Sequence, residues 1–214
     1  ARTGEFIDIF AHGTGEPGGA NGPNGLAFGP DSKLYVTTEG SVLGEFPGLP
    51  SEVLRFDIET GESETFIAQP EPSPASPGYV SLLGIVFGPD CRLRGSRRFP
   101  ACHVFVSDFA SDIRRYDQDG ELLAQLSTNY TGTIPSSNAT GALSFGAHGT
   151  LFTVGFDQRD GAENIGSVLR FDARTNSAWP LRPNEGALFV APSDVLSRPI
   201  GVLSTTTRPE LCQP

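Results

Sequence analysis

Short apolar runs separated by turn-forming residues follow one another along the whole chain. Runs such as 25–28 (GLAF), 34–36 (LYV) and 53–56 (VLRF) are rich in β-branched and aromatic residues and have the length of one strand. Turn sequences such as Gly-Pro-Asp at 29–31 and Glu-Thr-Gly at 59–61 bound them. No segment keeps a helical apolar period over three turns. The pattern predicts an essentially all-β protein.

The pattern is repeated along the chain. Residues 25–31 (GLAFGPD) return as 84–90 (GIVFGPD) and, more loosely, as 141–146 (GALSFG). In each unit an Arg-aromatic-Asp sequence follows, and these sequences lie at 55–57, 115–117 and 170–172. Because they recur at one position of the unit, we interpret them as structural: the aromatic residue packs between units and the aspartate begins a turn.

Four glycines open the repeated units at intervals of 57 to 60 residues: Gly25, Gly84, Gly141 and Gly201. Self-similarity at a fixed period of this size is typical of repeat architectures. We interpret each unit as a four-stranded antiparallel sheet with strands a to d in chain order. Such sheets packed around an axis are the blades of a β-propeller, which has four to eight of them. The predicted fold is an all-β propeller of four-stranded antiparallel blades, with about three and a half repeats.

We expect one propeller domain over 1–214. Its predicted parts are a partial blade 1–21, a blade 22–69, a Pro-rich linker 70–78, blades 79–128 and 139–190, and a partial blade 198–214. Residues 5–10 resemble a strand d, and residues 200–203 resemble a strand a. Two interpretations stay open: the chain is part of a longer propeller, or neighbouring chains complete one another in a ring or a filament.

The repeat resembles those of the NHL, gluconolactonase and regucalcin-type propellers. The resemblance rests on Pro-Asn-Gly-Leu-Ala-Phe-Gly-Pro-Asp at 23–31, on 34–36 and on 54–57, and it extends over most of the chain. In the gluconolactonase and regucalcin families an asparagine in a similar Asn-Gly position before strand a binds a divalent cation, and Asn24 matches it. The resemblance therefore implies Asn24 as a ligand of a divalent cation, for which Ca²⁺ is a candidate.

The remaining ligands are less evident. Glu39 and Asp108 follow strand b of their units and could add carboxylates, which Ca²⁺ requires among six to eight oxygens. The positions equivalent to Asn24 are Leu83, Thr140 and Ile200, of which two are apolar. The alternative interpretation makes Asn24 a turn residue and the two acids solvated loop residues.

Charge and cysteine content narrow the list of partners. A net charge of −10 argues against a nucleic-acid partner, and no apolar run is long enough to span a membrane.

Cys91 and Cys102 lie at the facing ends of two predicted hairpin strands, and we expect a disulfide between them. The loop that they enclose carries four arginines: Arg92, Arg94, Arg97 and Arg98. We expect it to dock an acidic protein, a second copy of this chain or an anionic glycan; the alternative is a merely solvated loop.

Two sequons indicate secretion. Asn129-Tyr-Thr and Asn138-Ala-Thr lie in one polar stretch and are candidate N-glycosylation sites. Together with the expected disulfide, they favour an extracellular location.

Catalytic signatures are missing from the sequence. It has no Gly-x-Ser-x-Gly motif, no pair of histidines with metal-ligand spacing and no phosphate-binding loop. We therefore favour an extracellular β-propeller that acts as a binding or self-assembly module, whose partner is itself or an extracellular protein or glycan. The alternative, which the resemblance suggests, is a divalent-metal-dependent lactonase or hydrolase of the gluconolactonase-regucalcin type.

Overall fold

The computed structural model describes residues 4–40, 48–92, 102–110, 112–146, 149–173, 177–178 and 187–204. Nearly every regular element in these ranges is a β-strand, and Pro89–Arg92 forms a 3₁₀ turn. None of the described segments forms a helix with the length and apolarity needed to cross a membrane.

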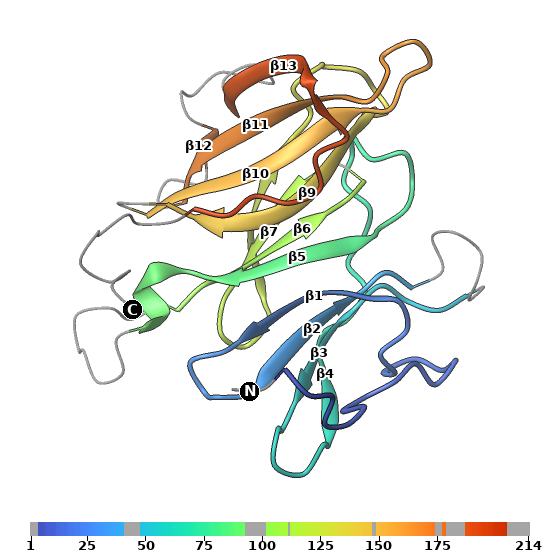
Figure 1. The fold of residues 1–214 in the computed structure, drawn as a ribbon, viewed down its shortest axis with the longest axis vertical. Helices are drawn as coiled ribbons and strands as arrows, with labels where there is room; N and C mark the ends of the chain where they lie inside the picture. Colours follow the sequence, from blue (N-terminus) through green and yellow to red (C-terminus); the bar gives the residue numbers. More distant parts are fainter. Residues whose placement is uncertain are drawn as a thin grey trace.

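Three antiparallel sheets follow one another along the chain. The first contains β1 (Pro23–Phe28), β2 (Leu34–Thr38), β3 (Val53–Phe56) and β4 (Ser63–Ile67). The second contains β5 (Leu82–Phe87), β6 (Val104–Asp108), β7 (Asp112–Tyr116) and β8 (Leu122–Ser127). The third contains β9 (Asn138–Phe145), β10 (Thr150–Asp157), β11 (Ile165–Asp172), β12 (Ser177–Ala178) and β13 (Leu188–Ser197). Figure 1 shows them as a stack in which β5–β8 lies between the other two.

Alternation along each strand divides its side chains between two neighbours. On β1, Ala27 points into the apolar cluster shared with the second sheet, together with Tyr35 and Val53. The flanking Leu26 and Phe28 therefore point to the opposite face, since successive strand residues alternate. The same alternation on β5 places Ile85 and Phe87 against the first sheet.

The innermost strands approach so closely that only glycine fits at the repeated position. A Cβ added to Gly25 would overlap the backbone oxygen of Leu83. A Cβ on Gly84 would lie 2.9 Å from the Cα of Ala142, and one on Gly141 would lie 2.7 Å from the oxygen of Ile200. The repeated glycine is therefore required by strand-to-strand packing, and β1, β5, β9 and 199–204 lie side by side in that order. This is the arrangement of blades in a β-propeller, as predicted.

Two predicted boundaries were wrong. The third blade does not end at residue 190, because β13 continues to Ser197 while pairing with β11. Residues 5–10, in the partial blade predicted over 1–21, belong to none of the described strands; Phe10 packs edge-on against Phe56, with ring centroids 5.7 Å apart. Segment 199–204 lies beside β9 as a strand a would, and the rest of the partial blade 198–214 is outside the described residues.

Candidate functional site

Two of the three predicted metal ligands lie together. Asn24 lies near the start of β1, and its Nδ2 donates to Glu39 Oε2 at 3.4 Å. Glu39 is held there because its own amide donates to the carbonyl of Gly22. Tyr79 lies at the same end of the blades and is half-buried. Its phenol pKa is raised, mainly by burial and to a smaller extent by the negative charges of Asp108 and Glu39.

Asp108, the third predicted ligand, is already fully engaged. It is fully buried at the end of β6, where its Oδ1 accepts the amides of Ser81 and Ala110 at 2.9 and 3.0 Å. Its Oδ2 accepts Arg114 Nη2 at 2.9 Å. The carboxylate thus ties the entry of β5 to the turn after β6.

These donors do not fit a calcium ion. Asn24 and Glu39 offer one amide oxygen and one carboxylate, while the oxygens of Asp108 are taken up by N–H donors. Calcium needs six to eight oxygens. Among the described residues, no group of three or more His, Cys, Asp or Glu side chains converges as a metal site would require.

The sequence analysis missed a buried ion triad. Arg114 on β7 is fully buried, and its Nε donates to Asp112 Oδ1 at 3.1 Å, in addition to its bond to Asp108. Asp112 Oδ2 and Arg114 Nη1 are both buried without a hydrogen-bond partner. Burial is the main reason why the Asp112 pKa rises to about 6; Arg114 opposes the rise and Asp108 adds to it. The signal in the sequence that could have predicted this triad was the presence of two acidic residues and one arginine at alternate, core-facing strand positions.

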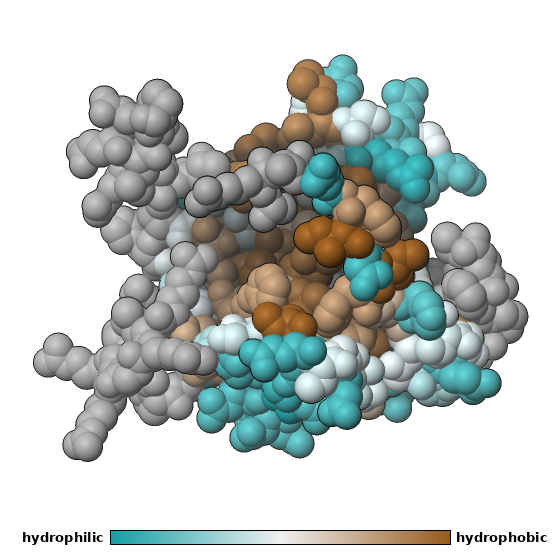
Figure 2. Space-filling model, turned by 60° about the horizontal axis from the view of Figure 1, so that its bottom comes forward, coloured by the Kyte–Doolittle hydropathy of each residue, from teal (hydrophilic) through white to brown (hydrophobic). Residues whose placement is uncertain are grey.

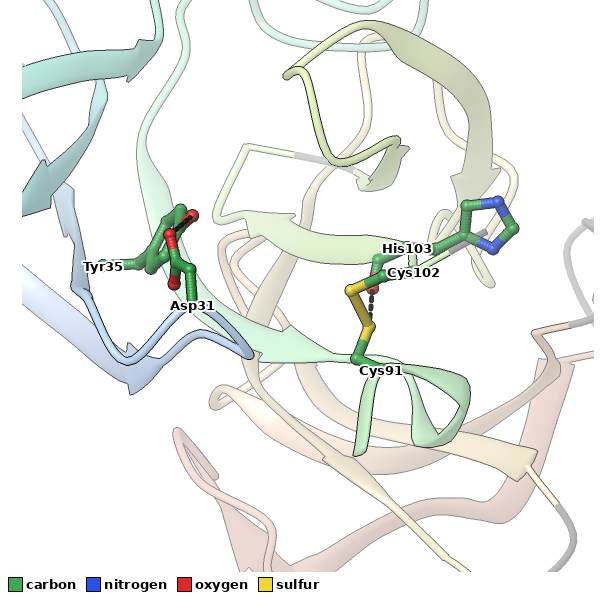
Figure 3. Close-up of a disulfide and its surroundings, with 5 residues drawn as sticks. All are labelled: Asp31, Tyr35, Cys91, Cys102 and His103. Atoms are coloured by element: carbon green, nitrogen blue, oxygen red, sulfur yellow. Dashed lines mark hydrogen bonds between the residues drawn. A yellow bond between two sulfur atoms is a disulfide. The ribbon is translucent and has the colours of Figure 1, made fainter. Parts of the chain in front are cut away.

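The predicted disulfide is present. Cys91 and Cys102 are joined, with their Cα atoms 4.5 Å apart, and Cys91 Sγ lies 3.5 Å from the carbonyl oxygen of His103 (Figure 3). Within the predicted docking loop, Arg92 ends the 3₁₀ turn and its side chain is not described. Arg94, Arg97 and Arg98 lie outside the described residues.

Both sequon asparagines point into the protein. Asn129 is 4% exposed, and its Nδ2 donates to the carbonyl of Thr133 at 2.7 Å. Asn138 is 1% exposed, and its Oδ1 accepts the amide and the hydroxyl of Thr131. A glycan on either Nδ2 would require this turn to open.

One aromatic contact is repeated at both interfaces between blades. Phe87 at the end of β5 packs edge-on against Tyr35 of the preceding blade, with ring centroids 4.9 Å apart. Phe145 at the end of β9 packs edge-on against Phe105 at 5.3 Å. In each case the last aromatic residue of strand a lies on the strand-b aromatic of the blade before it.

The first blade has the same residues, and no blade precedes it among the described residues. Leu26 is 67% exposed and Phe28 is 63% exposed, whereas the equivalent Ile85 is 5% exposed. The outer part of this face is covered, because Phe10 and Ala20 of the N-terminal segment pack over it. The bare part is therefore a strip one strand wide, carried by β1.

The C-terminal side of the stack is also uncovered. Segment 199–204 is tied to β9 by the amide of Ala142, which donates to Ile200 O at 2.9 Å, and by its own Ser204 amide, which donates to Ser144 Oγ. On its outward side, Ile200 is 64% and Leu203 is 82% exposed. Figure 2 shows a face on which hydrophobic residues gather in and around a hollow, between hydrophilic residues above and below.

The ends of the inner strands line an open pocket of about 570 Å³. Each of the four inner segments contributes, through Phe28, Phe87, Phe145 and Leu203.

Comparisons with known proteins give only distant matches. No family model and no curated protein matches the chain. Among solved structures it is similar to the PQQ-bound aldose sugar dehydrogenase of Streptomyces coelicolor, with TM-score 0.49, 20% identity, and coverage of 84% of this chain and 52% of that one. A putative oxidoreductase (glucose dehydrogenase) of Thermus thermophilus gives TM-score 0.48, 19% identity, and coverage of 79% and 50%.

A third similar structure is the oligogalacturonate lyase of Vibrio parahaemolyticus, with TM-score 0.43, 13% identity, and coverage of 80% of this chain and 43% of that one. The chain therefore spans about half the length of the solved structures it matches.

Proposed function

We propose that this chain is part of an extracellular β-propeller of the NHL and gluconolactonase-regucalcin type, and that it acts in binding and assembly through its uncovered blade faces. The observation that carries the proposal is the exposure of Leu26 and Phe28, since the equivalent residues of the next blade are buried (Ile85) and partly buried (Phe87). Contiguous exposed apolar residues of this kind mark interaction surfaces.

The secreted location is supported by the disulfide. Disulfides form and persist in oxidising compartments and are rare in reducing ones. Cys91 and Cys102 close a short loop with a sequence separation of 11 residues beside the first pair of blades.

The alternative function, a divalent-metal-dependent lactonase, has weaker support. It rests on Asn24 and Glu39, and the third expected ligand, Asp108, neutralises a buried arginine instead. An assembly function, by contrast, does not require this chain to supply any further metal ligand.

The proposal is tested by measuring association directly. Native mass spectrometry and analytical ultracentrifugation of the purified chain should show a multimer. The double variant Leu26→Ser/Phe28→Ser should shift the population to monomer without changing the β-sheet circular dichroism spectrum. Ile58→Ser, which alters a 48%-exposed side chain in the turn after β3, is the matched control and should leave association unchanged. A wild-type chain that stays monomeric at tens of micromolar would overturn the proposal.

A further inference from the structure

We propose that the groove between the first two blades is a binding site for one neutral sugar unit. The groove holds a pocket of about 220 Å³, and its described lining comes from the turns and strands of these two blades alone. It therefore uses neither of the uncovered faces. The inference adds a ligand site to the proposed function and does not rest on assembly.

The wall of the pocket is aromatic. The ring of Tyr35 packs edge-on against Phe66 of its own sheet and against Phe87 of the second blade, with centroids 5.0 and 4.9 Å apart. All three side chains line the pocket, together with the buried Val104. A concave, mainly apolar wall with a few polar groups is typical of small-molecule sites.

The second and third blades are tied together at the equivalent place. Arg115 on β7 corresponds to Arg55 on β3, because each pairs with the aromatic residue of strand b in its sheet. Arg115 reaches the third blade, where its Nη1 donates to the carbonyl of Ala173 at 3.2 Å. Arg55 Nε donates instead to Glu64 Oε1 on its own sheet at 2.9 Å, whereas the residue paired with Arg115 on β8 is Ala124. Glu64 thus keeps Arg55 on the first blade, and the pocket opens beside it.

Tyr35 brings a hydroxyl group to a buried position at this pocket. The residue is 4% exposed, and its hydroxyl donates to Asp31 Oδ2 at 3.0 Å (Figure 3). The same hydroxyl accepts Arg55 Nη1 at 3.4 Å. The equivalent residue of the second blade is Phe105, which has no such group. The polar network is therefore particular to the first blade and is not a consequence of the repeat.

The charges at the rim disfavour a charged ligand. Arg55 is already paired with Glu64 at 2.8 Å and with Asp31 at 3.9 Å, so it offers little net attraction to an anion. Its guanidinium lies over the rings of Tyr35 and Phe66, 5.9 and 5.5 Å from their centroids, where a ligand cation would otherwise bind. A neutral ligand is therefore favoured.

The second blade supplies hydrogen-bonding groups that the fold itself does not use. Gln118 and Asp119 line the pocket from the exposed turn between β7 and β8, and their side chains form no hydrogen bond within the described part of the chain. An amide both donates and accepts, and a carboxylate accepts. The hydroxyl groups of a sugar match this rim, and its C–H face matches the aromatic wall. The pocket is smaller than the roughly 300–1,000 Å³ of sites for drug-sized ligands, which suits a single sugar ring.

The test is saturation-transfer NMR of the full chain with the methyl glycosides of glucose, galactose, mannose and N-acetylglucosamine. At least one glycoside should give a saturable signal. Asp119→Ala should weaken its binding about tenfold or more, as expected for the loss of hydrogen bonds to a charged group. Tyr35→Phe, which gives the first blade the residue of the second, should also weaken it. Asp194→Ala, at an exposed position on β13, is the matched control and should leave the Kd unchanged.

Each outcome decides for or against the site. Saturable binding that Asp119→Ala and Tyr35→Phe weaken, in variants that keep the wild-type circular dichroism spectrum, supports it. No signal from any of the glycosides overturns the inference, and so does binding that neither variant changes. Binding of propylamine, a lysine side-chain analogue, without binding of the glycosides would mean that the pocket takes a cation instead. None of these results depends on whether the chain associates, so the proposed assembly function is tested separately.

Discussion

Asp108 and Arg114 form an ion pair at 2.9 Å, with both side chains fully buried between the first two blades. A buried ion pair is not by itself evidence of stability, because the free energy needed to desolvate the two charges is about as large as the free energy of their attraction. Removing one partner is different, since it leaves a buried charge without compensation. Asp108 also accepts the amides that open β5 and follow β6, so the pair fixes two loops at one end of the blades.

We expect Arg114→Met to destabilise the protein by about 3–5 kcal/mol, because two carboxylates would stay buried without their cation. Urea denaturation followed by circular dichroism measures this loss. Lys33→Met is the control: it breaks an ion pair with Glu64 in which the two side chains are 36% and 53% exposed, and it should cost far less than Arg114→Met. Equal effects of the two variants would show that the buried triad carries no special weight.

Stability should depend on pH through Asp112. Burial raises its pKa to about 6 from the ordinary 3.8, so the folded state holds the proton more tightly than the unfolded state. The free energy of unfolding should therefore rise as pH falls from about 6 to about 4, by on the order of 2 kcal/mol. Above about pH 6 the carboxyl is ionised in both states and the full cost of burying the charge applies. Burial raises the Asp108 pKa as well, which adds in the same direction.

Asp112→Asn separates this effect from other titrations. The variant keeps an oxygen that can accept from Arg114 Nε but has no proton to gain, so its stability should change less between pH 4 and pH 6. The measurement is a series of urea midpoints across that range, with the exposed Asp119→Asn as control. A wild-type midpoint that falls steadily with acid over the whole range would contradict the prediction.

The repeated glycine gives a third prediction. A Cβ at Gly84 would lie 2.9 Å from both the Cα of Ala142 and the Oγ of Ser107, so Gly84→Ala must separate two inner strands. We expect a loss of about 1–3 kcal/mol, the usual cost of overpacking. A Cβ at Gly201 would meet no atom of the described residues within 4 Å, so Gly201→Ala should change the stability of the monomer by no more than about 0.5 kcal/mol. The measurement is the melting temperature of both variants in thermal unfolding. The prediction is wrong if the two melting temperatures are the same.

The propeller fold was predictable because its sequence signal is local and repeated. Strand β3 (Val53–Phe56) matches the run predicted at 53–56, and the glycine spacing placed the inner strands β1, β5 and β9. The pairing of Asn24 with Glu39 was also accessible, since both lie at the ends of paired strands at one end of a blade. The burial of Asp108 could not be predicted from the sequence, because an acidic residue just after an apolar run is usually a loop residue. Its partner Arg114 lies on the next strand, and only the β6–β7 register brings the two together.

The disulfide should contribute measurably to stability. The two cysteines are 11 residues apart in the sequence, and in the chain-entropy model a disulfide that closes a loop of this size stabilises the folded state by roughly 3 kcal/mol. The double variant Cys91→Ser/Cys102→Ser should therefore unfold at a clearly lower temperature. Adding a reductant should lower the melting temperature of the wild type but not of the variant. Three reactive thiols in the native protein under non-reducing conditions would show that the bond does not form.

The buried sequons lead to the last prediction, which opposes the simple interpretation of the sequence. Asn129 and Asn138 share one turn, in which Thr131 bonds to both asparagine side chains. Asn129 Nδ2 donates to the carbonyl of Thr133, and Asn138 Nδ2 is buried. Because a glycan on either nitrogen would require the turn to open, we expect the protein secreted from a glycosylating host to be unmodified at both positions. Peptide mapping before and after treatment with an N-glycosidase measures this directly. Asn129→Asp and Asn138→Asp should each destabilise the protein, since a buried carboxylate would replace an amide. Glycans at high occupancy on a protein with an unchanged melting temperature would mean that this turn differs in the secreted form.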